Sequence, residues 1–167
     1  HSMRIPVLLF FFTGINWLSA DDSMRKAVQR AIPLIEKSAA TYIEERSCFS
    51  CHHQALTVMA LCRAKLAGFT VQDNIVSAQT KFTLEYFTER KERLPKGEGV
   101  PGGPYSAGYA LAGLAAAREP SNETPQALIQ YLLKKQNKDG SWRIRTHRPP
   151  LEDSDFTATA LGLKAMT

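Results

Sequence analysis

The sequence lacks the features that characterise several common protein classes. No segment alternates apolar and polar residues as a half-buried β-strand would, and apolar residues recur instead at helical spacing. No run of lysine and arginine with interleaved aromatic residues occurs, although the formal net charge is +5. Nucleic acid and anionic membranes are therefore not expected partners. These absences predict an all-α globular protein with a mildly basic, solvated surface.

Long apolar runs are also missing, and the apolar segment near the N-terminus is typical of a leader. Val7–Ile15 is shorter than the roughly 20 apolar residues that cross a bilayer. It follows Met3-Arg4 and precedes Leu18-Ser19-Ala20, which is the order of a secretory signal peptide. We interpret residues 1–20 as a signal peptide with leading extra residues, and expect a periplasmic or secreted bacterial protein. The alternative is an apolar N-terminal helix of the fold.

Residues 21–167 suffice for one hydrophobic core and are expected to form one helical domain, truncated at its C-terminus. Pro33 is expected to kink the first helix or to start its second part, and Gly68 to stop the second helix. Thr124 is expected to cap a later helix, with Pro125 at its first position. The periodicity predicts helices over about 23–45, from the cysteine motif to 67, and over 71–92, 106–118, 124–136 and onward from 154.

Two of these segments are expected to carry apolar stripes. In the first helix, Val28, Ile32, Ile35, Ala39 and Tyr42 share one face, and in the second Ala55, Met59, Cys62 and Leu66 do so. Cys62 is interpreted as a buried thiol. The Gly-rich segment 94–105 lacks the Lys-Ser/Thr ending of a phosphate-binding loop, so it predicts a connection and no nucleotide site.

Three small-residue segments recur about 50 residues apart, and each alternates with a bulkier, more charged helix. Such a period predicts stacked helical hairpins, in which small residues let the helix backbones approach closely. About three hairpins would form only an arc. The segments are HQALTVMALCRA, SAGYALAGLAAA and DFTATALGLKAM.

Cysteine and histidine are scarce, with three and four residues in 167, yet two of each lie in SCFSCHHQ. Chance would assemble C-x-x-C-H roughly once in a thousand such sequences. Cys48 and Cys51 have the spacing that bonds the two vinyl groups of a haem, and His52 follows as the axial ligand of the iron. Haem attachment takes place outside the cytoplasm, so the predicted signal peptide agrees with a covalent haem c.

Two other interpretations of this motif remain open. Cys48 and Cys51 could form a disulfide or a reactive dithiol in an oxidising compartment, although the βαβ context of thioredoxin-like proteins is absent. A zinc site would need a fourth ligand such as Cys62 or His147, because the motif supplies at most three.

The sixth ligand of a haem iron is unknown from the sequence. His53 is adjacent to the axial ligand and cannot reach the opposite haem face, and Met59 lies two turns along the same helix. Met24, His147 and Met166 would be available only through tertiary folding, and each is more simply a core methionine or a loop histidine. An open site would favour small-molecule binding or redox catalysis over simple electron transfer.

The segment QNKDGSW, residues 136–142, followed by EDSDFTATALGLKAM, resembles the Gln-Trp repeats of the squalene-hopene cyclase and prenyltransferase superfamily. The resemblance implies an α/α toroid of helical hairpins. It also implies that Gln136, Gly140 and Trp142 tie the end of an outer helix to the start of the next inner one. Together with the signal peptide and CFSCHHQ, the chain resembles secreted bacterial squalene-cyclase-like proteins that carry a c-type haem motif. A toroid needs roughly twice these hairpins, so the resemblance implies self-association or a missing C-terminal half, and an apolar ligand in the cavity.

The same resemblance suggests an acid-catalytic motif. Cyclases of this class use Asp-x-Asp-Asp-Thr-Ala, and Asp153-Ser-Asp-Phe-Thr-Ala matches it except that Phe156 replaces the last Asp. By that match Asp155 is the proton donor and Asp153 its hydrogen-bonded neighbour, since a carboxyl in an apolar cavity can act as an acid. The favoured alternative is that Ser154 or Asp155 caps the N-terminus of a helix.

Three functions follow from these patterns. The first is an exported c-type haem protein in redox or electron transfer, whose partner would be a redox protein or small molecule. The second is a non-haem binding or scaffold module with a Cys48–Cys51 disulfide or a metal. The third is a terpenoid-type cyclase that uses Asp155. The sequence favours the first function.

Overall fold

The computed structural model describes residues 17–144 and 154–166, and these residues are largely helical with no β-strand. The predicted all-α class is therefore confirmed. A π-helical turn, η1 (Cys51–Ala55), leads directly into α2, and a 3₁₀ turn, η2 (Leu94–Lys96), follows α3. In chain order, the α-helices are α1 (Trp17–Glu45), α2 (Leu56–Leu66), α3 (Asp73–Thr88), α4 (Pro104–Ala116), α5 (Glu123–Lys135) and α6 (Asp155–Ala165).

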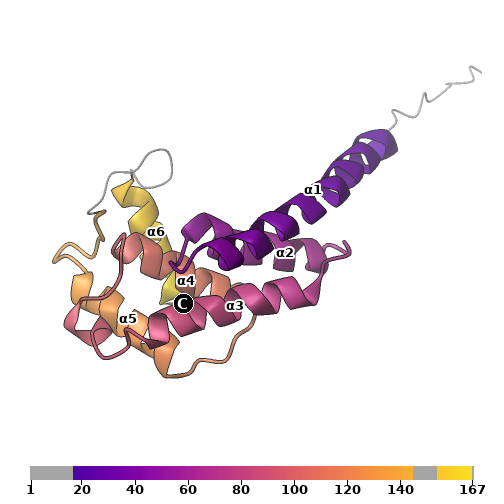
Figure 1. Ribbon diagram of the computed structural model, residues 1–167. Helices are drawn as coiled ribbons and strands as arrows, with labels where there is room; N and C mark the ends of the chain where they lie inside the picture. Colours follow the sequence, from indigo (N-terminus) through magenta and orange to yellow (C-terminus); the bar gives the residue numbers. More distant parts are fainter. Residues whose placement is uncertain (1–16, 145–153, 167) are drawn as a thin grey trace, which may run out of the picture.

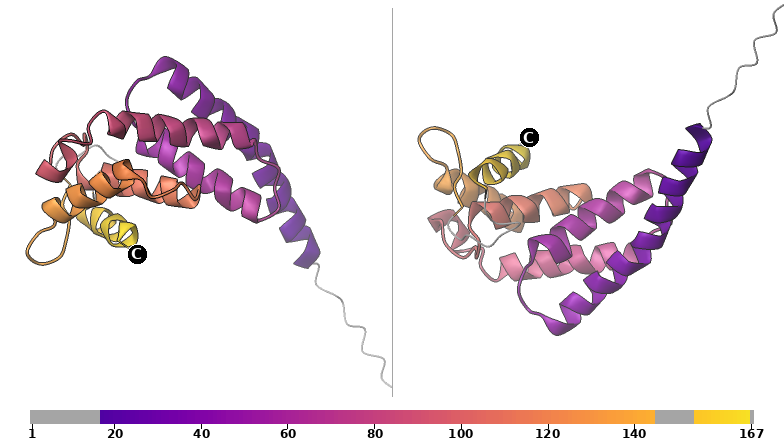
Figure 2. Two further views of the ribbon diagram at one scale, coloured as in Figure 1. Left: turned by 90° about the horizontal axis from the view of Figure 1, so that it is seen from below. Right: turned by 90° about the horizontal axis from the view of Figure 1, so that it is seen from above.

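The helices lie in two rows (Figures 1 and 2). In the inner row α4 packs between α2 and α6, and in the outer row α3 packs between α1 and α5. Contacts between α2 and α3 and between α4 and α5 join the rows. The three small-residue segments lie in this inner row. Closure of such rows into a toroid stays an expectation from the resemblance.

Small residues hold the inner row together at close range. A Cβ atom added at Gly108 would lie 2.7 Å from Cβ of Leu161 on α6, and one added at Gly113 would lie 3.0 Å from Cα of Ala55 in η1. Backbones this close leave no room for a larger side chain. The glycines in the middle of α4 therefore have a packing reason that outweighs their low helix propensity.

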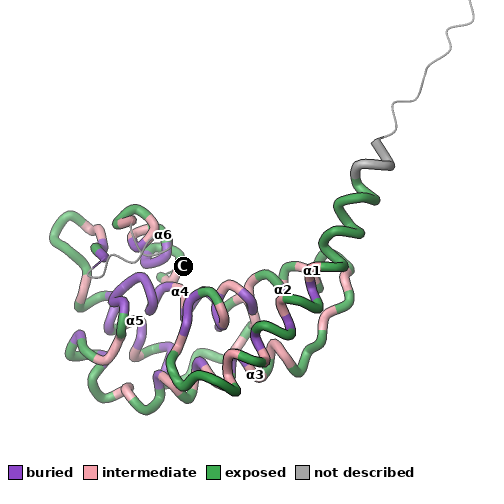
Figure 3. Tube along the Cα trace, turned by 45° about the horizontal axis from the view of Figure 1, so that its top comes forward, coloured by how far each residue is buried: buried purple, intermediate pink, exposed green. Residues whose placement is uncertain are grey.

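The core surrounds α4, which is the most buried helix (Figure 3). It includes Phe87 from α3, Leu128 and Leu132 from α5, and Trp142 from the segment before α6. By contrast, residues 21–30 of α1 are all exposed, because this part of the helix extends past its neighbours. Val28, predicted for the buried face, is accordingly exposed, whereas Ile32 and Ala39 are buried as expected.

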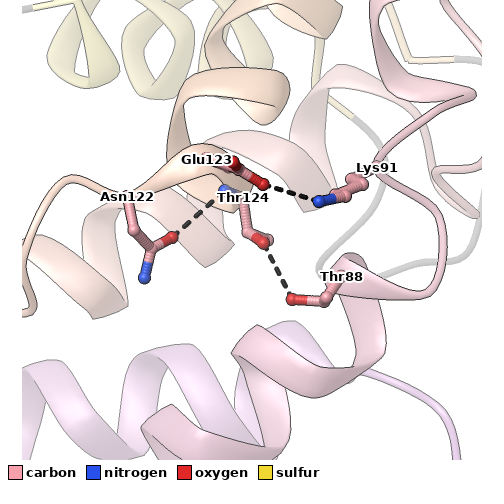
Figure 4. Close-up of polar contacts among 5 residues, drawn as sticks. All are labelled: Thr88, Lys91, Asn122, Glu123 and Thr124. Carbon is pink, nitrogen blue, oxygen red and sulfur yellow. Dashed lines mark hydrogen bonds and ion pairs between the residues drawn. The ribbon is translucent and has the colours of Figure 1, made fainter.

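The N-terminus of α5, which contacts α3, differs from the sequence prediction. Helix α5 begins at Glu123 with Asn122 as its cap, whose side-chain oxygen accepts from the backbone N–H of Thr124 at 3.1 Å. Thr124 is thus inside the helix, and its hydroxyl pairs with that of Thr88 at the end of α3 (Figure 4). The prediction of Thr124 as the cap, with Pro125 at the first position, was wrong because Asn122 caps the helix two residues earlier and the hydroxyl of Thr124 is engaged with Thr88. Lys91 and Glu123 add an ion pair beside it.

The remaining boundaries follow the sequence closely. Pro33 lies within α1, which continues to Glu45, and α2 ends just before Gly68, whose φ of 82° suits glycine. Gly103, with φ of 69°, precedes Pro104 at the first position of α4. None of the helices in the described ranges is long and apolar enough to cross a membrane.

Candidate functional site

The cysteine motif lies where the chain leaves α1 and enters the inner row. Its opening is organised by Ser50, whose hydroxyl accepts from the backbone N–H of His53 at 3.4 Å. In return, the side-chain oxygen of Gln54 accepts from the backbone N–H of Ser50 at 2.6 Å. This is the reciprocal pattern of a capping box. Because the turn is π-helical, the second side chain comes four residues after the cap instead of three. Side-chain caps therefore fix the positions of the residues between Ser50 and Gln54.

The three residues of the proposed attachment site differ in their exposure. Cys48 and His52 are exposed, whereas Cys51 is buried with its Sγ 3.6 Å from the hydroxyl of Ser106 on α4. The Sγ of Cys48 lies 3.2 Å from the hydroxyl of Tyr42 on α1. Neither cysteine forms a disulfide with a described residue, and each thiol has a hydroxyl partner from a different helix.

The ring of His52 is held by its Nδ1 atom, which lies 3.3 Å from the hydroxyl of Ser50. When Nδ1 carries the proton and donates to this oxygen, Nε2 keeps its lone pair for a metal. Metal-binding histidines are typically oriented in this way by a hydrogen bond from the other ring nitrogen. Ser50 thus suits His52 to the role of an axial ligand.

His53 has a different environment from His52. Its ring stacks on Tyr42, with centroids 4.3 Å apart and planes inclined by 17°. Burial lowers the pKa of His53, and the nearby charge of His52 lowers it further. Burial and the hydrogen bond with Cys48 raise the pKa of Tyr42 to about 12. Both side chains are therefore neutral at neutral pH.

A groove of about 550 Å³ runs along α1 beside this stack. Tyr42 and His53 provide a flat aromatic wall, and Leu34 adds an apolar side chain that is 71% exposed. Lys37 and Arg46 supply two positive charges along the groove, and Glu45 supplies one negative charge. An apolar planar group with carboxylate substituents would find both a stacking surface and cations here.

The described residues contain no group of three histidine, cysteine or acidic side chains that could hold a metal ion. The zinc interpretation thus gains no support from these parts of the chain. Cys62 is half-buried on α2, contrary to the expectation of a core thiol, and His147 lies outside the described residues. Burial raises the pKa of the Cys62 thiol, which is therefore protonated at neutral pH.

The candidates for a sixth ligand stay dispersed. Met24 is 62% exposed on the projecting part of α1, and Met166 is 37% exposed after the last turn of α6. Met59 lines a different groove, between α2 and α4. Among the described residues, no methionine lines the groove beside His53.

The segment that resembles a Gln-Trp repeat forms a set of contacts apart from the cysteine motif. The indole N–H of Trp142 donates to the carbonyl of Leu132 at 2.8 Å, and the side-chain amide of Gln136 donates to the carbonyl of Gly140 at 3.0 Å. The backbone N–H of Trp142 donates to the hydroxyl of Thr159 on α6 at 3.0 Å. These contacts tie α5 to α6, and we call residues 136–144 the Trp142 turn.

Asp155 contacts the Trp142 turn and is exposed. It lies at the first turn of α6, and its Oδ1 accepts from the backbone N–H of Ile144 at 2.8 Å. Ser154 caps α6 by accepting from the backbone N–H of Thr157 at 3.2 Å, which confirms the predicted cap. Asp153 lies outside the described residues.

Sequence reasoning missed the side chains that support the motif. Ser50 could have been recognised, because a serine immediately before a helical segment is a typical cap. Tyr42 is 6 positions from Cys48 and Ser106 is 55 positions from Cys51, so no local pattern identifies them.

Comparison with known proteins gives no match to this chain, whether with family models, curated proteins or solved structures.

Proposed function

We propose that this chain is an exported protein that carries one covalent haem c, bound through Cys48 and Cys51 with His52 as the axial ligand. Its function would be haem-based redox or electron transfer, with a redox protein or a small molecule as partner. The scaffold would be an arc of helical hairpins like those of the squalene-cyclase superfamily. The single observation that supports the proposal best is His52, exposed beside a free, exposed Cys48 and held at Nδ1 by Ser50.

The bound haem would supply an iron that changes between two oxidation states. The chain's own residues position and surround it. Ser50 orients the imidazole of His52, and the hydroxyl of Tyr42 holds Sγ of Cys48 at 3.2 Å. The aromatic wall of the groove and the cations Lys37 and Arg46 suit a planar apolar group with two carboxylates.

Cys51 imposes an order on attachment. Its thiol lies at the start of η1 and packs against α4, where Ser106 is its hydroxyl partner. A reagent or vinyl group reaches Cys48 in the folded protein, but reaches Cys51 only when η1 has not yet packed or has opened locally. We therefore expect efficient attachment during export and folding rather than to the folded chain.

The test is the intact mass and the pyridine haemochrome spectrum of protein secreted from a host competent in cytochrome c maturation. We expect the mass increment of one haem, which the Cys48→Ala, Cys51→Ala double variant loses and the matched Cys62→Ala variant keeps. His52→Ala should retain the covalent mass but change the visible spectrum, because only the axial ligand is removed. An unmodified wild-type chain from that host would refute the haem proposal. Thiol counting would then test the disulfide interpretation.

A further inference from the structure

A second groove, separate from the cysteine motif, lies between the inner helices. It has a volume of about 680 Å³, and its lining comes from α2, α4 and the end of α6. Leu56 and Met59 line it from α2, and the small side chains Ala112 and Ala115 line it from α4. Leu66, at the end of α2, is 70% exposed there. An apolar surface of this kind is a typical ligand or partner site.

The only charges among the described residues that line this groove are positive. Arg63 projects from α2 and Lys164 from α6, and no carboxylate accompanies them in the lining. The neighbouring Lys65 is neutralised by Asp73, whereas Arg63 forms no ion pair with any residue in the described ranges. The groove therefore combines an apolar wall with a guanidinium available to an anion.

The lining also limits the kind of molecule that fits. An extended peptide would leave its backbone N–H and C=O groups facing alanine, leucine and methionine without partners. A helix about 10 Å wide would fill this volume with roughly six residues, which is too short to be stable on its own. A flexible hydrocarbon chain has no polar groups to satisfy. The thiol of Cys62, whose pKa is raised by burial, adds no charge at neutral pH.

We propose that this groove, between α2 and α4, binds a single-chain anionic amphiphile, namely a fatty-acid carboxylate. The acyl chain lies along Met59, Leu66 and Ala115, and the carboxylate pairs with Arg63, with Lys164 beside it. This site is independent of haem attachment, since none of its residues belongs to the cysteine motif.

The test is a binding titration of the full chain with laurate, measured by displacement of a fluorescent apolar probe below the critical micelle concentration. Glycerol monolaurate, which has the same acyl chain and a neutral head, is the matched ligand. We expect laurate to bind about tenfold more tightly than monolaurin. The free energy of a hydrogen bond to a charged group corresponds to at least a tenfold difference in affinity. Shorter carboxylates should bind progressively more weakly as methylenes are removed.

Two variants separate the head-group contact from the apolar groove. Arg63→Gln should weaken laurate binding about tenfold and leave monolaurin binding unchanged. The matched control Arg30→Gln removes the same charge from α1, outside the groove, and should change neither. Ala115→Leu fills the exposed groove without disturbing the core, and should weaken both ligands. Circular dichroism checks that each variant folds.

Several results would overturn the proposal. These are equal affinity for laurate and monolaurin, equal effects of Arg63→Gln and Arg30→Gln, or no displacement of the probe by laurate. Tighter binding of a prenyl diphosphate than of laurate would overturn the choice of a carboxylate. The Cys48→Ala, Cys51→Ala variant should bind laurate like the wild type, so failure of the haem proposal leaves this test intact.

Discussion

Two segments of this protein open an inner helix in similar ways but use their polar groups differently. Ser50 caps the turn that leads into α2, and Ser154 caps α6. Around the Trp142 turn the polar groups described above have partners within the protein. In the cysteine motif His52 and Cys48 face solvent, and Nε2 of Gln54 is buried without a partner among the described residues. Two similar helix openings thus differ in their surroundings: one joins helices, and the other leaves a thiol and an imidazole exposed.

The largest effect is expected where the Trp142 turn is broken. Trp142→Ala removes a side chain that is 1% exposed and also the hydrogen bond to Leu132. We expect a loss of about 3–5 kcal/mol in the free energy of unfolding, measured by urea denaturation. Phe156→Ala is the control, because Phe156 is 84% exposed, and it should change stability by less than about 0.5 kcal/mol. A small effect of Trp142→Ala would show that the Trp142 turn contributes little to holding α5 and α6 together.

The next largest change in stability is expected at two glycines, which pack against the segments that open α6 and α2. An added Cβ at Gly162 would lie 2.7 Å from Cε3 of Trp142, whereas one at Gly113 would lie 3.0 Å from Cα of Ala55. We expect Gly162→Ala to destabilise by about 1–3 kcal/mol despite its gain in helix propensity. Gly113→Ala should also destabilise, but by less than Gly162→Ala, because its closest contact is longer. Thermal or urea unfolding measures both, and the reverse order would contradict the comparison.

A third test removes the two serine caps. Ser50→Ala and Ser154→Ala should each cost about 1 kcal/mol, since each loses one helix-capping hydrogen bond. Only Ser50→Ala should also disturb His52, because its hydroxyl lies 3.3 Å from Nδ1. The measurement is urea unfolding together with the NMR signals of the imidazole ring. Unchanged His52 signals in Ser50→Ala would show that the serine does not orient the ring.

The smallest expected effect is a pH dependence confined to the motif. The pKa of His53 lies below its usual value of about 6.5, so the unfolded chain binds this proton more readily than the folded chain. Its contribution to stability is therefore complete above about pH 6.5 and is lost as the pH falls below that value. His53→Gln should flatten the dependence. NMR titration should also show the pKa of His53 rising in His52→Asn, and no rise would contradict the role assigned to His52.

The sequence predicted the helices well because their boundaries depend on local chemistry. Gly68 ends α2 and Ser154 starts α6 through backbone geometry and capping that act within a few residues. The cap of α5 was misassigned because Asn122 and Thr124 are both good caps and only the packing against Thr88 decides between them.

The site was harder to predict because its supporting residues come from other helices. The motif identified Cys48, Cys51 and His52, but not that Cys51 would be buried against Ser106. Helix α2 is apolar on more than one face, so its periodicity could not show which face is buried. Val58 and Leu61 enter the core, whereas Met59, Cys62 and Leu66 line the second groove. The apolar stripe predicted for the core is thus largely a surface feature.

The close approach of α4 to its neighbours has a consequence for selectivity. The glycine contacts set the separation of the inner-helix backbones, and no change of side-chain rotamer can alter that distance. We therefore expect the groove between α2 and α4 to have a fixed width and to select a bound molecule by its thickness. A single substitution at Arg63 would change the charge at the groove. A wider groove would require coordinated substitutions on two helices.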